Sequence, residues 1–170
     1  VIESSSKDNP QEIGGISIDG AGGPDLFGYK WRDSNEPNGP QYVWNDISST
    51  GTLATTWVST GTYNAKDEGY AGPFPLGFNF KFYGQEKNQI YVSSNGLILF
   101  NTVSTDIFSN TQIPNVEVPN EYIAPFWDDL DLSGLSGDRG VWWRILGVAP
   151  SRQVVVEWYQ VPSHEHGSEG

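Results

Sequence analysis

Residues 78–100 read FNFKFYGQEKNQIYVSSNGLILF, and this stretch decides the fold. Three phenylalanines at its start alternate with polar residues, which is typical of a strand with one buried face and one wet face. Further along, Asn95-Gly96 stands between two apolar runs and predicts a tight hairpin, because both residues tolerate positive φ. The stretch therefore predicts consecutive antiparallel strands joined by short turns.

The rest of the chain also shows the signals of short strands and turns. Gly and Pro punctuate it throughout, and no segment shows the apolar spacing of three and four that a helix needs. Further strands are predicted at alternating or β-branched runs: 27–31, 42–47, 54–58, 122–127, 141–145 and 153–160. These features predict an all-β fold, a two-sheet antiparallel β-sandwich of jelly-roll or Ig-like general shape, with long loops at 19–40 and 101–121 and little or no helix.

Length and charge limit the classes of function. The chain has 170 residues, 21 Asp and Glu against 9 Lys and Arg, a net charge of −12 and no Cys. The small number of bases argues against nucleic acid as a partner, and the absence of Cys removes disulfides and thiol chemistry. No apolar run is long enough for membrane insertion. We expect residues 1–18 to be a linker or an N-terminal strand, and 19–170 to be a single β-sandwich module.

Several short motifs in a fixed order resemble the nidogen-type extracellular domain. They are similar also to β-sandwich modules of large bacterial and archaeal secreted or surface proteins. The motifs are Phe82-Tyr83-Gly84, YVSSNGLILF at 91–100, IAPFWDDLD at 123–131, GPDLFGYKWRDS at 23–34 and VVEWY at 155–159. The resemblance implies a non-catalytic extracellular or cell-surface module for adhesion, recognition or assembly, with a protein or a glycan as its partner.

One departure from that resemblance concerns the C-terminus. Such modules normally continue beyond the strand that contains Trp158-Tyr159, and this sequence stops at Gly170. We expect the module to lack its last strands, either because it is a cut piece, which we favour, or because a strand from another molecule completes it. The second alternative makes the chain a subunit of an extracellular filament that self-assembles by strand addition.

The strongest candidate site is an acidic loop that predicts Ca²⁺ binding. Its ligands would be Asp128, Asp129, Asp131, Ser133 and Asp138, since Ca²⁺ prefers hard oxygen ligands from one compact turn. The loop is not an EF-hand, because Gly140 occupies the place of the closing Glu. The alternative is a solvated loop whose carboxylates accept hydrogen bonds from local backbone.

A second acidic group lies in the Gly-rich block near the N-terminus. Asp19, Asp25 and Asp33 would supply further metal ligands and could share an ion with the first loop. Turns stabilised by these side chains, with no ion, are the favoured interpretation here.

Seven tryptophans raise the alternative of a carbohydrate-binding accessory domain of a secreted hydrolase. Trp142 and Trp143 are adjacent on a predicted strand and point to opposite faces, so only one of them can enter a given core layer. They are the candidate ligand-binding residues. The other tryptophans, at 31, 44, 57, 127 and 158, are expected to pack in the core or at strand edges.

A catalytic function is not expected. Both histidines lie in the tail segment His164-Glu165-His166, which is polar and suggests no preformed metal or catalytic geometry. No Gly-x-Ser-x-Gly motif is present, and neighbouring carboxylates such as Asp128 and Asp129 diverge on a strand. The sequence thus predicts a binding or assembly module and not an enzyme.

Overall fold

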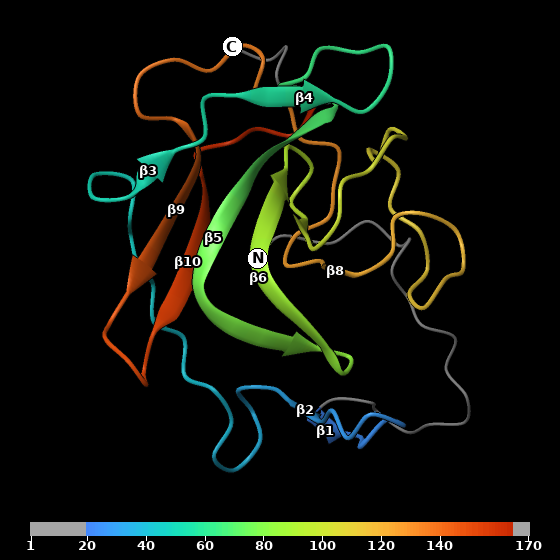
Figure 1. The fold of residues 1–170 in the computed structure, drawn as a ribbon, viewed down its shortest axis with the longest axis vertical. Helices are drawn as coiled ribbons and strands as arrows, with labels where there is room; N and C mark the ends of the chain where they lie inside the picture. Colours follow the sequence, from blue (N-terminus) through green and yellow to red (C-terminus); the bar gives the residue numbers. More distant parts are fainter. Residues whose placement is uncertain (1–19, 165–170) are drawn as a thin grey trace. The chain divides into compact units, whose positions relative to one another are not determined.

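The computed structural model describes residues 20–164, which form ten β-strands and no α-helix (Figure 1). The chain divides into two compact units, residues 1–44 and 45–170. In the described part of the first unit, β1 (Ala21–Gly22) and β2 (Trp31–Arg32) form an antiparallel hairpin. A strand was predicted over 27–31, but only its end is extended. The residues before it form a turn closed by the carboxylate of Asp25, which accepts the N–H of Phe27.

The second unit contains a five-stranded antiparallel sheet with the order β4-β5-β6-β7-β8. Its strands are β4 (Trp57–Ser59), β5 (Gly69–Phe82), β6 (Gln85–Ser93), β7 (Ile98–Leu99) and β8 (Tyr122–Ile123). The phenylalanines of β5 alternate with exposed residues, as predicted. The predicted hairpin at Asn95-Gly96 is confirmed, since Val92 pairs with Ile98 across it.

A three-stranded antiparallel sheet with the order β10-β9-β3 forms the other layer of this unit. It consists of β3 (Thr52–Leu53), β9 (Gly140–Leu146) and β10 (Gln153–Tyr159). Figure 1 shows β9 and β10 running beside β5 and β6. The indole of Trp158 on β10 donates to the carbonyl of Ser93 on β6, so the two layers are joined by a hydrogen bond as well as by apolar contact. The predicted all-β antiparallel sandwich is confirmed.

The main core lies between these two sheets. Both contribute buried apolar side chains, and aromatic residues pack around them: Ala71, Leu76, Ile90, Val92, Phe100 and Val141, with Phe80, Phe82, Val154, Val156 and Trp158 at the margin. A second, smaller cluster forms around Leu97, Leu99 and Ile107. Because Ile107 belongs to the long 101–121 loop, that loop covers the outer face of the five-stranded sheet.

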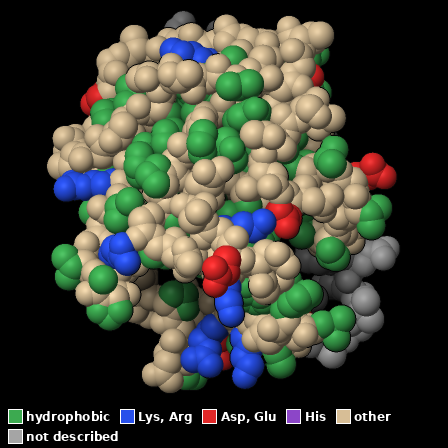
Figure 2. Space-filling view, viewed as in Figure 1, with side chains coloured by type: hydrophobic (Ala, Val, Ile, Leu, Met, Phe, Trp, Pro, Cys, Tyr) green, Lys and Arg blue, Asp and Glu red, His purple; other side chains and the backbone are tan. Residues whose placement is uncertain are grey.

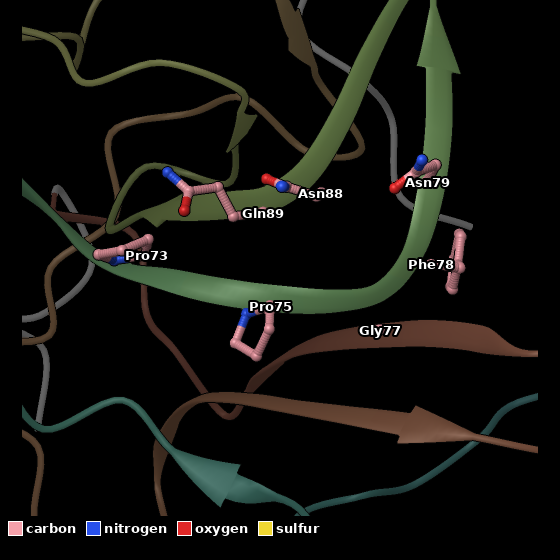
Figure 3. Close-up of a pocket in the computed structure, with 7 residues that line it drawn as sticks. All are labelled: Pro73, Pro75, Gly77, Phe78, Asn79, Asn88 and Gln89. Atoms are coloured by element: carbon pink, nitrogen blue, oxygen red, sulfur yellow. The ribbon is translucent and has the colours of Figure 1, made fainter.

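Strand β5 bends strongly, and its pairing with β6 has two irregularities, between Ala71 and Phe74 and between Pro75 and Phe80. Prolines cannot donate to a ladder, and such irregularities increase the local twist of a sheet. The second irregularity borders an open groove of about 450 Å³ (Figure 3). Its lining is uncharged: Pro73, Pro75, Gly77, Phe78, Asn79, Asn88 and Gln89.

Further sequence predictions need correction. No strand forms over 42–47; instead, the N–H of Ile47 donates to the carboxylate of Glu157, and this side-chain contact replaces a ladder. The predicted strand over 122–127 is limited to β8, which lies at the edge of its sheet, as Pro125 had indicated. Trp31 and Trp44, which were expected to pack in the core or at strand edges, are about half exposed, at 48% and 59%.

Gly96 should be the least replaceable glycine of the hairpins. Its φ is +78°, and an added Cβ would stand 1.7 Å from the carbonyl oxygen of Phe126. Gly84 has the same φ of +78° but open space around it. We expect Gly84→Ala to cost about 1 kcal/mol of unfolding free energy, from φ alone, and Gly96→Ala to cost at least about 2 kcal/mol more. Urea unfolding of the two variants measures these losses. Equal losses would contradict the close contact between Gly96 and the carbonyl oxygen of Phe126.

Candidate functional site

Five ionisable side chains from three separate segments converge at one place in the second unit. We call Asp67, Glu68, Asp129, Asp131 and His164 the acidic cluster. Oxygen atoms of Asp67, Glu68 and Asp129 all lie within 4.8 Å of one another, as do single ligand atoms of Asp67, Asp131 and His164. A small cavity of about 140 Å³ opens here, lined by Tyr63, Asp67, Glu68, Phe108, Asp129 and His164.

Backbone hydrogen bonds bring these segments together. The carbonyl of Asn64 accepts the N–H groups of Asp67 and Glu68, at 3.0 and 2.7 Å, and this turn leads directly into β5. On the other side, the N–H of His164 donates to the carbonyl of Asp129 at 2.8 Å. An antiparallel bridge between Leu130 and Ser163 lies beside that bond. The cluster is therefore built on paired backbone and not on loose loops.

Glu68 is the buried centre of the cluster, with only 3% of its surface exposed. Asn95, which is fully buried, donates from Nδ2 to both carboxylate oxygens of Glu68, at 3.1 and 3.0 Å. The same Asn95 accepts the N–H of Leu130 at its Oδ1, at 2.9 Å. Ile107 donates its N–H to Glu68 Oε2 at 3.3 Å. The side chains of Asn95 and Glu68 thus join the turn before β5, the β6–β7 hairpin, and the loops that contain Ile107 and Leu130.

Burial and neighbouring charges shift the pKa values of two acids in this cluster. Desolvation, only partly offset by the hydrogen bond from Asn95, raises the pKa of Glu68 from 4.5 to about 7. Burial also raises the pKa of Asp67, and the charge of Asp131 adds to that effect. His164 Nδ1 lies 3.5 Å from Asp67 Oδ1 and opposes the shift. Asp67 Oδ1 is buried and accepts no hydrogen bond among the described residues.

The acidic loop that was predicted to bind calcium is only partly assembled here. Asp129 and Asp131 join the cluster, whereas Asp128 and Asp138 are not among its grouped ligand atoms. Asp128 Oδ1 accepts the N–H of Asp129 at 2.9 Å, and Asp131 Oδ1 accepts the N–H of Ser133 at 2.6 Å. These are the turn-forming bonds that the alternative interpretation anticipated. Calcium binding by this loop stays a prediction.

The N-terminal acidic group lies in the first unit, and Asp19 falls outside the described residues. Asp25 Oδ1 accepts the N–H groups of Phe27 and Tyr29, both at 2.9 Å. Asp33 Oδ1 accepts the N–H of Asn35 at 2.8 Å. Both carboxylates therefore stabilise turns, which is the interpretation that the sequence favoured for this group.

The two adjacent tryptophans of β9 differ in their surroundings. Trp143 points between the sheets, where its ring lies 4.9 Å from that of Phe74. Trp142 points to the other face, and its Nε1 donates to the carbonyl of Asp138 at 2.7 Å. As expected from strand geometry, the two side chains do not share a face.

Sequence reasoning missed Asp67, Glu68 and Asn95 as members of a site. Asn95 was recognised only as a hairpin residue, and the two acids stand in a polar stretch that has no motif. His164 was assigned to a tail without geometry, yet it packs against Asp67; Glu165 and His166 lie outside the described residues. The available signal was the SSNG run of residues 93–96, whose polar residues are fully buried.

A comparison with protein families identifies this architecture. A family model described as NIDO related matches residues 41–169, which is most of the chain. The chain belongs to the NIDO-related family. No curated protein and no solved structure matches it. Because nidogen-like domains are typically extracellular, membership of this family indicates an extracellular module. Within residues 20–164, no helix has the length and apolar character to cross a membrane.

The raised pKa of Glu68 predicts a pH dependence of stability. The unfolded chain loses this proton near pH 4.5, whereas the folded protein keeps it to about pH 7. The folded state therefore binds more protons between these values, and the free energy of unfolding falls as pH rises through this window. The loss is on the order of 3 kcal/mol, because one pKa unit corresponds to about 1.4 kcal/mol.

Glu68→Gln should remove this part of the dependence. Urea unfolding of wild type and variant from pH 4 to 8, in chelator, measures it. The difference between the two curves reports the ionisation of Glu68 together with its coupling to Asp67 and Asp129. Parallel curves would show that Glu68 ionises normally in the folded state.

Proposed function

We propose that this NIDO-related domain is a non-catalytic extracellular adhesion and assembly module, which associates with a second copy through the free edge of β10. The observation that carries the proposal is that edge. Strand β10 is the terminal strand of its sheet, is seven residues long and reads QVVVEWY. Its only charged residue is Glu157, which is 3% exposed and bonded to Ile47.

Hydrogen bonding shows which backbone groups of β10 face outward. Ala54 donates to the carbonyl of Val141, so the backbone of Val141 points toward β3. Successive residues of an antiparallel strand point to opposite edges, so Trp142 points toward β10 and pairs with Glu157. It follows that Val154, Val156 and Trp158 direct their N–H and C=O groups away from β9. No other described residue hydrogen-bonds to these groups.

An edge of this kind favours pairing with another strand. Proteins usually protect long edge strands with Lys, Pro, bulges or short length, and β10 has none of these. Antiparallel pairing about Val156 would place Val154 opposite Trp158 of the second copy, and the reverse, which gives apolar cross-strand pairs and a closed two-fold contact. Since no exposed charge lies on the strand, two copies of this acidic chain can approach here.

The state of Glu68 supports a non-catalytic role. The raised pKa of Glu68, beside the carboxylates of Asp67 and Asp129, could suggest the pair of acids of a glycosidase. However, both oxygens of Glu68 are held by Asn95, and its side chain has almost no exposed surface. A general acid must reach the atom that it protonates. Glu68 is positioned to support the fold instead.

Val156→Pro tests the assembly proposal. Proline removes an N–H that the monomer does not use, and its ring blocks an added strand. Sedimentation over a concentration series should show wild type as a monomer–dimer equilibrium and Val156→Pro as a folded monomer, with a lower melting temperature because the Val156 side chain also packs against the core. Val148→Pro, in the exposed turn beside the same sheet, is the matched control and should still dimerise. Wild type that stays monomeric up to its solubility limit would refute the proposal.

We further propose that Ca²⁺ stabilises this module at the acidic cluster. Two observations support it: Asp67 Oδ1 is buried and has no hydrogen-bond partner among the described residues, and one carboxylate oxygen of Asp67 lies within 4.8 Å of oxygens of Glu68 and Asp129. Calcium prefers carboxylate ligands of this kind. Burial, with repulsion from neighbouring acids adding to it, raises the pKa values of Asp67 and Glu68, and the charge of the ion would favour their ionised forms. Bound calcium would therefore link the turn before β5 to the loop after β8.

Calcium should raise the melting temperature relative to excess chelator. At about 100 times its dissociation constant, a ligand adds about 2.7 kcal/mol to the free energy of unfolding. Asp129→Asn should abolish the calcium-dependent shift, whereas Asp138→Asn, which alters an acid outside the cluster, should preserve it. Identical melting curves of wild type in calcium and in chelator would exclude this part of the proposal.

A further inference from the structure

The acidic cluster contains a second group of ligand atoms, which differs from the calcium group because one of its atoms is a nitrogen. Single ligand atoms of Asp67, Asp131 and His164 all lie within 4.8 Å of one another. This group shares Asp67 with the calcium group, whose other members are Glu68 and Asp129. On the face that Figure 2 shows, Asp and Glu side chains are scattered among other residues, and no described histidine is in view. The grouping of an imidazole with carboxylates is therefore a local feature of the molecule.

Backbone pairing directs the side chains of Asp131 and His164 to the same side of their two segments. Leu130 forms an antiparallel bridge with Ser163. The N–H of Asp131 donates to the carbonyl of Pro162 at 3.1 Å, beside that bridge. Neighbouring residues of an extended segment point to opposite sides, and residues paired across a bridge point to the same side. Because Leu130 is buried in the protein, its neighbour Asp131 and the neighbour of Ser163, His164, point together away from it.

The turn before β5 brings the third ligand to this place. The N–H of Leu132 donates to the carbonyl of Lys66 at 3.0 Å, and this bond holds the turn that contains Asp67 against the loop that contains Asp131. Asp67 Oδ1 is buried and has no hydrogen-bond partner among the described residues. Nδ1 of His164 lies 3.5 Å from this oxygen. That separation exceeds the usual length of an N–H···O hydrogen bond, about 2.7–3.2 Å.

The distance between these two atoms suits two ligands of one metal ion. Ligand atoms that lie about 2.0–2.1 Å from a tetrahedral Zn²⁺ are roughly 3.3 Å from each other. Calcium prefers oxygen ligands, whereas an imidazole nitrogen suits Zn²⁺ and related transition-metal ions. The side chain of His164 is 55% exposed and that of Asp67 is 18% exposed. An ion can therefore enter from the side of the imidazole and meet a carboxylate that the fold holds in place.

We propose that Asp67, Asp131 and His164 bind a divalent transition-metal ion, of which Zn²⁺ is the representative, at a site beside the calcium site. Two carboxylates and one imidazole supply three ligands, and water completes the coordination. The bound ion would connect the segment after β10 to the turn before β5. This site goes beyond the proposed function, since it depends neither on calcium binding nor on assembly through β10.

Calorimetric titration of residues 1–170 with Zn²⁺, in a buffer that does not chelate metals, tests the site. Wild type should bind one Zn²⁺ ion per chain tightly. His164→Gln removes the nitrogen ligand but keeps the backbone N–H that bonds to Asp129. It should weaken Zn²⁺ binding at least about tenfold, because loss of even a hydrogen-bond partner of a metal ligand costs about 10–100-fold in affinity. Asp131→Asn keeps an acceptor for the N–H of Ser133 and should weaken Zn²⁺ binding likewise.

His166→Gln is the matched control, because it replaces the other of the two histidines in the chain. It should bind Zn²⁺ as wild type does, which separates the proposed site from capture of the ion by the two histidines of the tail sequence alone. Equal weakening in His164→Gln and His166→Gln would refute the proposal. So would Asp131→Asn with the affinity of wild type, or a wild type that binds no Zn²⁺.

Asp129→Asn distinguishes this site from the calcium site. This variant should lose the calcium-dependent shift of the melting temperature and keep its affinity for Zn²⁺, whereas His164→Gln should show the reverse. Loss of both responses in both variants would indicate one shared site and contradict the proposal. A wild type whose melting curve does not respond to calcium would refute only the calcium proposal, so the two proposals fail separately.

Discussion

The buried contact between Asn95 and Glu68 is the constraint on which the rest of the second unit depends. Asn95 uses Nδ2 for both oxygens of Glu68, Oδ1 for the N–H of Leu130 and its own carbonyl for the N–H of Asp128. Asn95 is fully buried, so each lost bond would leave a buried polar group unpaired. Three segments distant in sequence must therefore take their observed places together.

This constraint explains the acidic cluster. Fixing Glu68 before β5 and Leu130 after β8 brings Asp67 and Asp129 close, although like charges repel. Burial raises the pKa values of Asp67 and Glu68, and the charges of neighbouring acids add to that effect. The hydrogen bonds of Asn95 hold these acids in place although their surroundings disfavour the charged forms. A cation at this place would reduce the repulsion without moving the backbone.

Sequence reasoning anticipated the fold better than the site, for physical reasons. Period-two alternation in β5 and the turn preference of Asn95-Gly96 are local properties, so they identified strands and the hairpin. Asp129 and Asp131 were found because they stand in an acidic loop. Their partners Asp67 and His164 lie far away in the chain and have no local signal. The strand expected over 42–47 failed because the backbone of Ile47 bonds to a distant side chain, Glu157.

The energetic coupling between Asn95 and Glu68 tests this account most directly. A double-mutant cycle with Asn95→Ala, Glu68→Ala and the double variant, followed by urea unfolding at pH 8, measures it. Residues in one buried hydrogen-bond network show coupling energies of about 0.5–3 kcal/mol, and we expect a value in the upper half of that range. Additive effects of the two substitutions would contradict it, since they would show that the contact does not join the segments of the fold.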